Sequence, residues 1–254
     1  MERIDELQRD GLKLIQDPDC FCFGTDAVLL ADFASARPGE KVMDLCAASS
    51  VVSTLMYARC PEAFYTGLEI QPKQADMGRR SIKMNGLSGR LTMVEGDLRK
   101  VETLFPRASF DVVTANPPYM PPDSLKAKSE EVAIARSEIC CTLEDVIRAA
   151  SYLLKYHGRF YIVYKPSRLA ELFEKLLAYR LEPKTMQLVF PYKDREPEQV
   201  LIGASKQGGR QMRILPPLIT YEKPGVYTRQ MLQVYGQDGH HLPLADTSRS
   251  ATGQ

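Results

Sequence analysis

The chain has 254 residues, of which 44% are hydrophobic and 26% charged, and its formal net charge is +1. This composition is typical of a globular protein with one large domain, and the near-neutral charge argues against a strongly basic nucleic-acid-binding protein while leaving a local basic patch open. No apolar run is long enough to cross a bilayer, and the charged amino terminus has no signal-peptide core. The six cysteines form no C-x-x-C pair and do not cluster with the three histidines, so we expect free thiols in a reducing cytosol and no metal site.

Strand-like and helix-like stretches alternate through the middle of the chain. Strands are predicted at residues 41–45, 64–70, 91–94, 110–115 and 160–164, and helices at 51–59, 72–85 and 143–156. The helix at 143–156 has apolar residues spaced for one buried face, and we expect Gly158 to end it. Such an alternation indicates an α/β fold with a mostly parallel, doubly wound sheet.

Shorter elements are expected on both sides of this core. After a helix at 169–179, strands at 185–190 and 199–204 are predicted to form an antiparallel hairpin at one sheet edge. Before the core, strands at 12–16 and 21–24 are expected to pair, and Thr25-Asp26 to cap a helix at 27–34. The sequence thus predicts a hairpin and helix over 1–35, a core domain over 36–235, and a disordered tail over 236–254.

Polar side chains end four successive predicted strands. They are Asp44, Glu69, Asp97 and Asn116. Because open α/β sheets bind ligands at the carboxyl ends of their strands, we expect these residues to share a nucleotide-like cofactor site. Glu69 suits ribose hydroxyls, and Asp97 suits an adenine amino group.

The fourth strand end continues as Asn116-Pro117-Pro118-Tyr119. The two prolines stiffen the backbone there. The Asn116 amide carries both a donor and an acceptor, and Tyr119 offers a flat face for stacking. Together these residues suit a planar substrate that carries an NH2 group.

The order of strand ends and the Asn-Pro-Pro-Tyr motif resemble the S-adenosylmethionine-dependent amino methyltransferases. Residues 22–30, 134–136, 142–145 and 215–218 resemble one branch, the bacterial tRNA(Val) adenine-N6 methyltransferase-like proteins, which modify the adenosine 3′ of the anticodon. The resemblance implies a Rossmann-like, seven-stranded methyltransferase sheet with a carboxyl-terminal antiparallel hairpin and a short amino-terminal extension. It also implies S-adenosylmethionine as cofactor, tRNA as partner, a cytoplasmic location, and no metal or membrane.

The resemblance further implies roles for particular residues. The cofactor residues would be Thr25, Asp44, Cys46, Ala48, Ser50, Glu69, Ile70, Asp97, Leu98 and Asn116. Asn116, Pro117, Pro118 and Tyr119 would be catalytic: the Asn116 oxygen and the Pro117 carbonyl accept the N–H groups of the substrate amine, and Tyr119 stacks on the base. Basic residues that could meet RNA phosphates are Lys126, Lys128, Arg136, Lys193 and Arg195, with Arg210 and Arg213 near the carboxyl end.

The chain departs from the family in one place. The family pattern after the first strand is Asp-Leu-Gly-x-Gly-x-Gly, and here residues 44–50 read Asp-Leu-Cys-Ala-Ala-Ser-Ser. We favour a loop that still binds the cofactor with altered geometry, because the other site residues are present. The alternatives are a non-catalytic RNA-binding homologue, or a methyltransferase for a glutamine amide in a protein, for which the region before the first strand looks too short and strand-rich.

Overall fold

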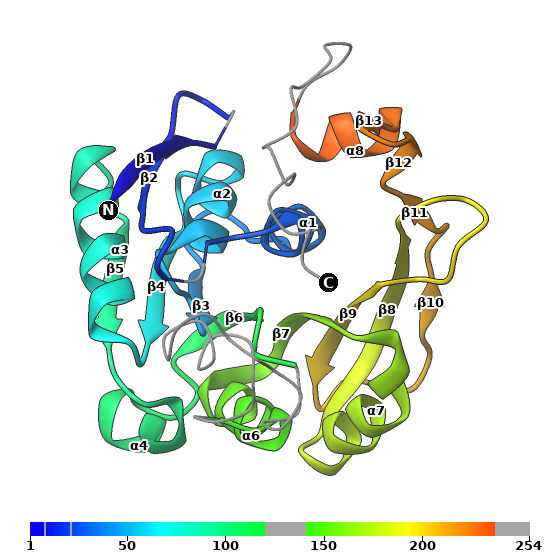
Figure 1. Ribbon diagram of the computed structural model, residues 1–254. Coiled ribbons are helices and arrows are strands. Elements are labelled where there is room, and N and C mark those ends of the chain that lie inside the picture. The colour runs from blue at the N-terminus through cyan, green and yellow to red at the C-terminus, as the bar shows by residue number, and fades with distance from the viewer. Residues whose placement is uncertain (8, 21, 120–140, 237–254) are drawn as a thin grey trace, which may run out of the picture.

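The computed structural model describes residues 1–7, 9–20, 22–119 and 141–236. A nine-stranded sheet crosses the molecule in the order β10-β8-β9-β7-β6-β3-β4-β5, with β11 also paired to β8 (Figure 1). Its strands are β3 (Lys41–Leu45), β4 (Phe64–Glu69), β5 (Leu91–Glu95), β6 (Phe110–Ala115), β7 (Leu154–Tyr164), β8 (Leu181–Phe190), β9 (Gln199–Lys206), β10 (Arg213–Ile214) and β11 (Leu218–Ile219). The helices are α1 (Thr25–Phe33), α2 (Val51–Arg59), α3 (Pro72–Met84), α4 (Val101–Leu104), α6 (Leu143–Leu153), α7 (Leu169–Ala178) and α8 (Arg229–Val234), with single 3-10 turns η1 (Leu98–Lys100) and η3 (Pro166–Arg168).

The sheet confirms the predicted doubly wound α/β fold. Strands β5, β4, β3, β6 and β7 are parallel neighbours, whereas β9 runs antiparallel between β7 and β8. The predicted carboxyl-terminal hairpin is therefore present as β8 and β9. The expectation of seven strands was too low, because β10 and β11 each add a short parallel pairing to the outer side of β8.

Two apolar layers cover the sheet. One is built on α1, α2 and α3, and the other on α6, α7 and the turn that opens α4. Figure 1 shows α4, α6 and α7 on one side of the sheet and α1 and α2 on the other. The parallel strands are buried on both faces, as their runs of Val, Met, Leu and Ala require.

The amino-terminal hairpin differs from the prediction. Strand β2 (Lys13–Gln16) pairs with β1 (Arg3–Glu6), not with the described residues 22–24 of the predicted second strand. The predicted strand does not form at Cys22, Phe23 and Gly24, which lie in an irregular segment instead. Helix α1 begins at Thr25, two residues earlier than predicted; its N-cap residue is Gly24, and no side chain caps it, so the predicted cap at Thr25-Asp26 was wrong.

Helix α6 is shorter than predicted. A capping box between Thr142 and Asp145 opens it, and it ends at Leu153 because the chain then becomes strand β7. Gly158 lies within that strand and does not end the helix. A Cβ at Gly158 would lie 3.0 Å from the Lys155 carbonyl oxygen and 3.1 Å from that of Asp111, so glycine is required by close backbone approach at an irregularity in the β6–β7 pairing.

The carboxyl-terminal part holds elements that the sequence did not indicate. After β11, a small hairpin of β12 (Tyr221–Lys223) and β13 (Val226–Tyr227) leads to α8. The Tyr221 and Tyr227 rings stack with centroids 5.1 Å apart. The tail predicted to be disordered lies, beyond Gly236, outside the described residues. Within the described part of the chain, no helix is long and apolar enough to span a membrane.

Candidate active site

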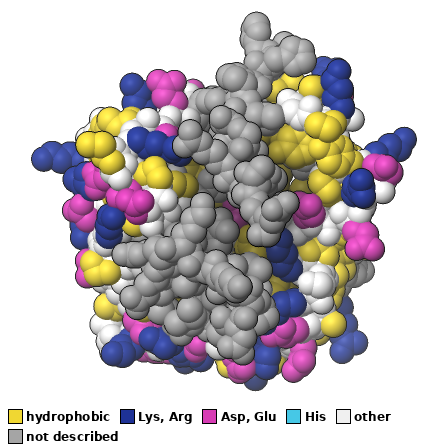
Figure 2. Space-filling view, viewed as in Figure 1, with side chains coloured by type: hydrophobic (Ala, Val, Ile, Leu, Met, Phe, Trp, Pro, Cys, Tyr) yellow, Lys and Arg dark blue, Asp and Glu magenta, His cyan; other side chains and the backbone are white. Residues whose placement is uncertain are grey.

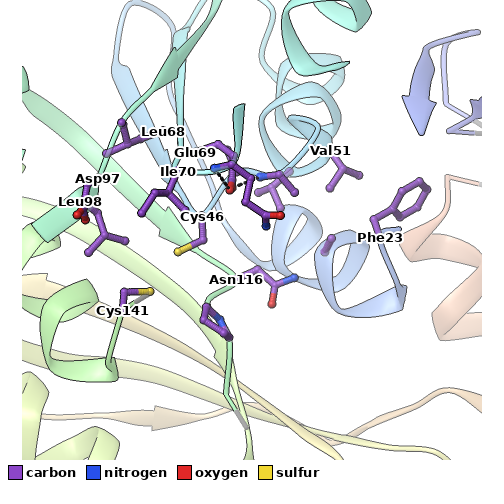
Figure 3. A pocket seen from close by; sticks show the side chains of 17 residues that line it. Phe23, Cys46, Val51, Leu68, Glu69, Ile70, Asp97, Leu98, Asn116 and Cys141 are labelled. Atoms are coloured by element: carbon purple, nitrogen blue, oxygen red, sulfur yellow. Dashed lines mark hydrogen bonds between the residues drawn. The ribbon is translucent and has the colours of Figure 1, made fainter. Parts of the chain in front are cut away.

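A cleft opens at the carboxyl ends of β3, β4, β5 and β6. It encloses about 770 Å³ of empty space, a volume that includes the open solvent at its mouth. Its lining comprises Phe23, Ala27, Cys46, Ala47, Ala48, Val51, Val52, Leu68, Glu69, Ile70, Gln71, Gly96, Asp97, Leu98, Asn116, Pro118 and Cys141 (Figure 3). The doubly wound topology brings these segments together from four consecutive strand ends.

Most of the predicted cofactor residues line this cleft. They are Cys46, Ala48, Glu69, Ile70, Asp97, Leu98 and Asn116, and the predicted catalytic Pro118 joins them. Thr25, Asp44, Ser50, Pro117 and Tyr119 are not among its lining residues. The roles of all the predicted site residues, inside the cleft or outside it, remain predictions.

The described residues do not show a common surface for the residues predicted to contact RNA. Lys126, Lys128 and Arg136 lie outside the described residues, and Lys193 and Arg195 lie in the connection between β8 and β9. On the visible face of the molecule, Lys and Arg side chains are interspersed with Asp and Glu (Figure 2). No contact with RNA follows from this arrangement.

Glu69 is held rigidly at the end of β4. Its Oε2 accepts a hydrogen bond from the Ala48 amide and its Oε1 from the Gln71 amide, each at 2.9 Å (Figure 3). Burial raises the pKa of this carboxyl, while the backbone amides oppose the rise. A carboxylate has about four acceptor positions, so Glu69 retains capacity for ligand hydroxyls.

Asp97 is engaged by a neighbouring arginine. The Arg99 guanidinium donates to both carboxylate oxygens, at 3.0 Å from Nε and 2.7 Å from Nη2, and the Arg99 amide also donates to Oδ1. These bonds hold the pKa of Asp97 below its usual value. A ligand amino group at Asp97 therefore competes with the arginine side chain.

Asp44 does not line the cleft but is buried within the sheet behind it. It is 1% exposed, and its carboxylate accepts hydrogen bonds from Thr114 Oγ1 at 2.8 Å and Ser53 Oγ at 3.1 Å. Burial raises the pKa of Asp44 to about 7 despite these bonds. The residue ties β3 to β6 and to the beginning of α2.

The loop of residues 46–50 keeps a backbone that normally requires glycine. Cys46, Ala48 and Ser50 have φ of 57°, 45° and 74°, and they occupy the three glycine positions of the family pattern. A non-glycine residue in such a conformation costs about 1–3 kcal/mol and persists only where its surroundings enforce it. The replacement of the glycines therefore changed the side chains and left the loop path glycine-like.

The Asn-Pro-Pro-Tyr segment forms the opposite side of the cleft. Asn116 is half-buried at the end of β6, and Pro117 and Pro118 are buried. The Tyr119 ring meets Tyr164 edge-on at 6.3 Å, and the Tyr119 carbonyl lies 3.4 Å from Arg168 Nη1. Lys165 also contacts Tyr119, with its ammonium over the ring. Lys165 and Arg168, which follow β7 and which the sequence did not single out, thus hold Tyr119.

Cys141 is a further residue of the site that the sequence did not indicate. Its thiol and that of Cys46 point toward one another across the cleft (Figure 3). The hydrogen bond to Cys141, with burial, raises the pKa of Cys46 well above its usual value. The described cysteines are free thiols, and no group of three or more potential metal ligands occurs within the described residues.

The chemistry of the cleft fits a group that carries a nucleoside. Apolar side chains such as Leu68, Ile70 and Leu98 suit the faces of a base, and the Glu69 carboxylate suits ribose hydroxyls. The small side chains at Cys46 and Ala48 leave the cleft open beside the loop. The described residues therefore remain compatible with a nucleoside cofactor although the glycines are absent.

Comparisons with known proteins agree with this geometry. Proteins named tRNA1(Val) (adenine(37)-N6)-methyltransferase resemble the chain: that of Porphyromonas gingivalis is 29% identical over 184 residues, covering 70% of this chain and 72% of the relative. That of Bacteroides fragilis is 25% identical over 215 residues, covering 84% and 90%.

Solved structures show the same fold. A predicted O-methyltransferase from Agrobacterium tumefaciens matches with a TM-score of 0.68 at 24% identity, covering 83% of this chain and 95% of that one. Geranyl diphosphate C-methyltransferase from Streptomyces coelicolor, in complex with S-adenosyl-L-homocysteine, matches with a TM-score of 0.54 at 16% identity, covering 72% and 77%. The family model described as "Methyltransferase domain" matches residues 36–213, which include all the strand ends that build the cleft. With that match and this arrangement of strand ends, the chain belongs to the methyltransferase-domain family.

Proposed function

We propose that the protein transfers a methyl group from S-adenosylmethionine to the exocyclic N6 nitrogen of an adenine in tRNA, next to the anticodon of a valine-type tRNA. The observation that carries the proposal is the shared cleft, in which Glu69 and Asp97 lie together with Asn116 and Pro118. The activity named for the similar Porphyromonas and Bacteroides proteins supports the choice of acceptor.

The donor half of the cleft would hold the cofactor through its nucleoside. Glu69 would accept hydrogen bonds from the ribose hydroxyls, and Asp97 from the adenine amino group. Leu98 and Ile70 would enclose the base, and the 46–50 loop would lie beside the amino-acid part. S-Adenosylmethionine, when bound, supplies an electrophilic methyl group on its sulfonium.

The acceptor half would prepare the amine. The lone pair of an adenine amino nitrogen is delocalised into the ring, so the nitrogen is a poor nucleophile. The Asn116 side-chain oxygen and the Pro117 carbonyl would accept the two N–H groups and favour a pyramidal nitrogen, while Tyr119 would stack on the extruded base. Stacking of this kind contributes about 1–3 kcal/mol per base. Rate enhancement would come from positioning and electrostatics rather than from a strong base.

The reaction is tested by incubating the protein with methyl-labelled S-adenosylmethionine and unmodified valine tRNA, followed by nucleoside analysis. We expect label in N6-methyladenosine. Label in any other nucleoside overturns the proposed acceptor. A tRNA substrate also agrees with the cytoplasmic location expected from the sequence.

Two further measurements separate the alternatives: incubation with labelled S-adenosylmethionine in the presence of a protein release factor as well as tRNA, and calorimetry with S-adenosylmethionine. Label in the side-chain amide of a glutamine in a protein release factor, with none in tRNA, would favour the amide methyltransferase. Calorimetry that detects no S-adenosylmethionine binding, even at millimolar ligand, would favour a non-catalytic RNA-binding protein. The left-handed conformations in the 46–50 loop make this calorimetric measurement the first to perform.

A further inference from the structure

The 46–50 loop is held by hydrogen bonds to its main-chain atoms, including those from the Ala48 amide to Glu69 and from Thr54 Oγ1 to the Ser50 carbonyl, and by a hydrogen bond to the side chain of Ser49. The Ala47 amide donates to the Leu68 carbonyl at 3.1 Å, and the Ser50 amide to the Ala47 carbonyl at 2.7 Å. Both bonds involve only main-chain atoms, so a loop with glycines would make them equally well. They do not explain how this loop tolerates three side chains at positive φ.

The bond to the Ser49 side chain comes from the amino-terminal hairpin. Gln16, the last residue of β2, donates from Nε2 to Ser49 Oγ at 2.9 Å. Gln16 is 2% exposed and Ser49 1% exposed, so water does not compete for this bond. Ser49 lies between Ala48 and Ser50, two of the residues with left-handed backbone.

Gln16 is itself firmly anchored. Strand β2 is hydrogen-bonded to β1, and the Ile15 amide donates to Ser81 Oγ of α3 at 2.9 Å. Asn85, at the end of α3, adds a bond from its side chain to the Lys13 carbonyl at 2.7 Å. The Gln16 side chain thus extends from a fixed support toward the loop.

The hydrogen bond from Gln16 to the loop leaves the other polar atom of its amide unpaired. Its Oε1 is buried and has no hydrogen-bond partner among the described residues. A buried acceptor without a partner is unfavourable, and leucine or methionine at this position would avoid it. The Gln16 amide therefore makes a buried bond to Ser49 while leaving its Oε1 unpaired, an arrangement that a side chain serving only to fill space would not need.

We propose that Gln16 is a positioning residue for the cofactor loop: its bond to Ser49 holds residues 46–50 in the glycine-like path that S-adenosylmethionine requires, in place of the missing glycines. The inference rests on the proposed cofactor and is independent of the methyl acceptor. The amino-terminal hairpin is then part of the donor site although it does not line the cleft.

The proposal gives Gln16 a role that depends on the loop sequence. Side chains at positions 46, 48 and 50 disfavour the glycine-like path of the loop. Removal of the Gln16 bond then lowers the fraction of molecules that can bind S-adenosylmethionine, and the apparent Kd rises by the same factor. When glycines occupy positions 46, 48 and 50, the loop adopts this path without help from Gln16. Removal of the bond then has little effect on binding.

The test compares four proteins by calorimetry with S-adenosylmethionine in the absence of RNA. They are the natural chain, Gln16→Leu, the glycine-restored chain Cys46→Gly/Ala48→Gly/Ser50→Gly, and the glycine-restored chain with Gln16→Leu. We expect Gln16→Leu to raise Kd about tenfold in the natural chain and less than twofold in the glycine-restored chain. Equal effects in both backgrounds, or a change below twofold in the natural one, overturn the proposal.

Two further variants separate loop positioning from general stability. Ser49→Ala removes the same hydrogen bond from its other end, so it should raise Kd as Gln16→Leu does, and the two changes together should cost no more than one. Asn85→Ala loosens the hairpin on α3 without touching the loop and should leave Kd within twofold. An Asn85→Ala protein that binds as weakly as Gln16→Leu would contradict the specific role of Gln16.

These measurements distinguish the loop inference from the proposed reaction. If the natural chain binds S-adenosylmethionine but methylates no RNA, the reaction is wrong and the four Kd values still decide the inference. If neither the natural nor the glycine-restored chain binds at millimolar ligand, the cofactor assignment is wrong and the inference falls with it. If only the glycine-restored chain binds, the Gln16 bond does not hold the loop of the natural chain in the path that the cofactor requires, and the inference is overturned.

Discussion

The Lys165 ammonium lies 4.8 Å from the centroid of the Tyr119 ring. Lys165 follows β7 directly, and its Nζ also donates to the Glu198 carbonyl at 3.3 Å. A cation over a tyrosine face is attracted to the ring and fixes both groups. The charge therefore lies against one face of the ring that, in the proposed reaction, stacks on the target base.

Substitution of Lys165 by methionine should weaken RNA binding. Methionine keeps an unbranched apolar chain beside Tyr119 but removes the charge that can meet a phosphate. We expect the KM for tRNA to rise about tenfold, and the slope of log affinity against log salt to decrease by about one. Cofactor affinity, measured by calorimetry, should stay within twofold.

A suitable control is Lys41→Met. Lys41 begins β3, at the opposite end of the strand from the cleft, and is exposed. This variant should bind tRNA as the natural chain does. Equal losses in both variants would mean that overall charge, and not the contact with Tyr119, determines RNA binding.

Replacement of Asn116 by alanine should separate binding from catalysis. The side-chain oxygen that would accept a substrate N–H is lost, and removal of one such group typically lowers kcat by about 10²–10³-fold. Asn116 lines the cleft at the end of β6. Cofactor affinity should remain nearly unchanged, and undiminished methylation in the labelled-nucleoside assay would refute the proposed mechanism.

The ion pair between Asp97 and Arg99 should restrain cofactor binding. Arg99 donates to both Asp97 oxygens, so it competes with a ligand amino group. Removing the competitor in Arg99→Ala should tighten S-adenosylmethionine binding about two- to threefold, whereas Asp97→Ala should weaken it about tenfold. Calorimetry on the two variants checks both directions, and weaker binding by Arg99→Ala would show that the arginine itself supports the ligand.

Asp44 should make stability depend on pH around neutrality. Burial raises its folded-state pKa to about 7 from 3.8, so between these values the folded protein holds a proton that the unfolded chain has released. The resulting stability is lost as pH rises through about 7, by at most about 4 kcal/mol. Thermal unfolding of the natural chain and of Asp44→Asn should therefore diverge from pH 5 to pH 8, with the natural chain losing more. Parallel profiles would mean that Asp44 does not titrate in this range.

The sequence was most informative where chemistry and topology coincide. The alternation of strands and helices predicted the sheet, and the polar residues that end β4, β5 and β6 were correctly expected to meet, because parallel strands present their carboxyl ends at one edge. Glu69, Asp97 and Asn116 could thus be placed together from their order alone. The cofactor and acceptor roles assigned to them remain predictions.

Other features depend on long-range packing that no local pattern encodes. The pairing of β1 with β2 places an exposed, charged strand beside a half-buried one, whereas the more apolar residues 22–24 became an irregular segment. Cys141 reaches the cleft because α6 packs beneath β6, and Lys165 meets Tyr119 because β6 and β7 are neighbours. Likewise, the sequence showed that the loop glycines were missing but not that Cys46, Ala48 and Ser50 retain their backbone conformation.

The pairing of β10 and β11 with β8 has a consequence for shortened forms of the protein. Strand β8 is hydrogen-bonded to β9 on one side and, at Thr185–Met186 and Val189–Phe190, to these two short strands on the other. Between them lie Pro216 and Pro217, which have no amide hydrogen to offer a further strand. A chain cut after Lys206 would lose this cover and expose a long strand edge to other molecules. We expect this shortened protein to aggregate through the exposed edge of β8 rather than to lose only the cleft.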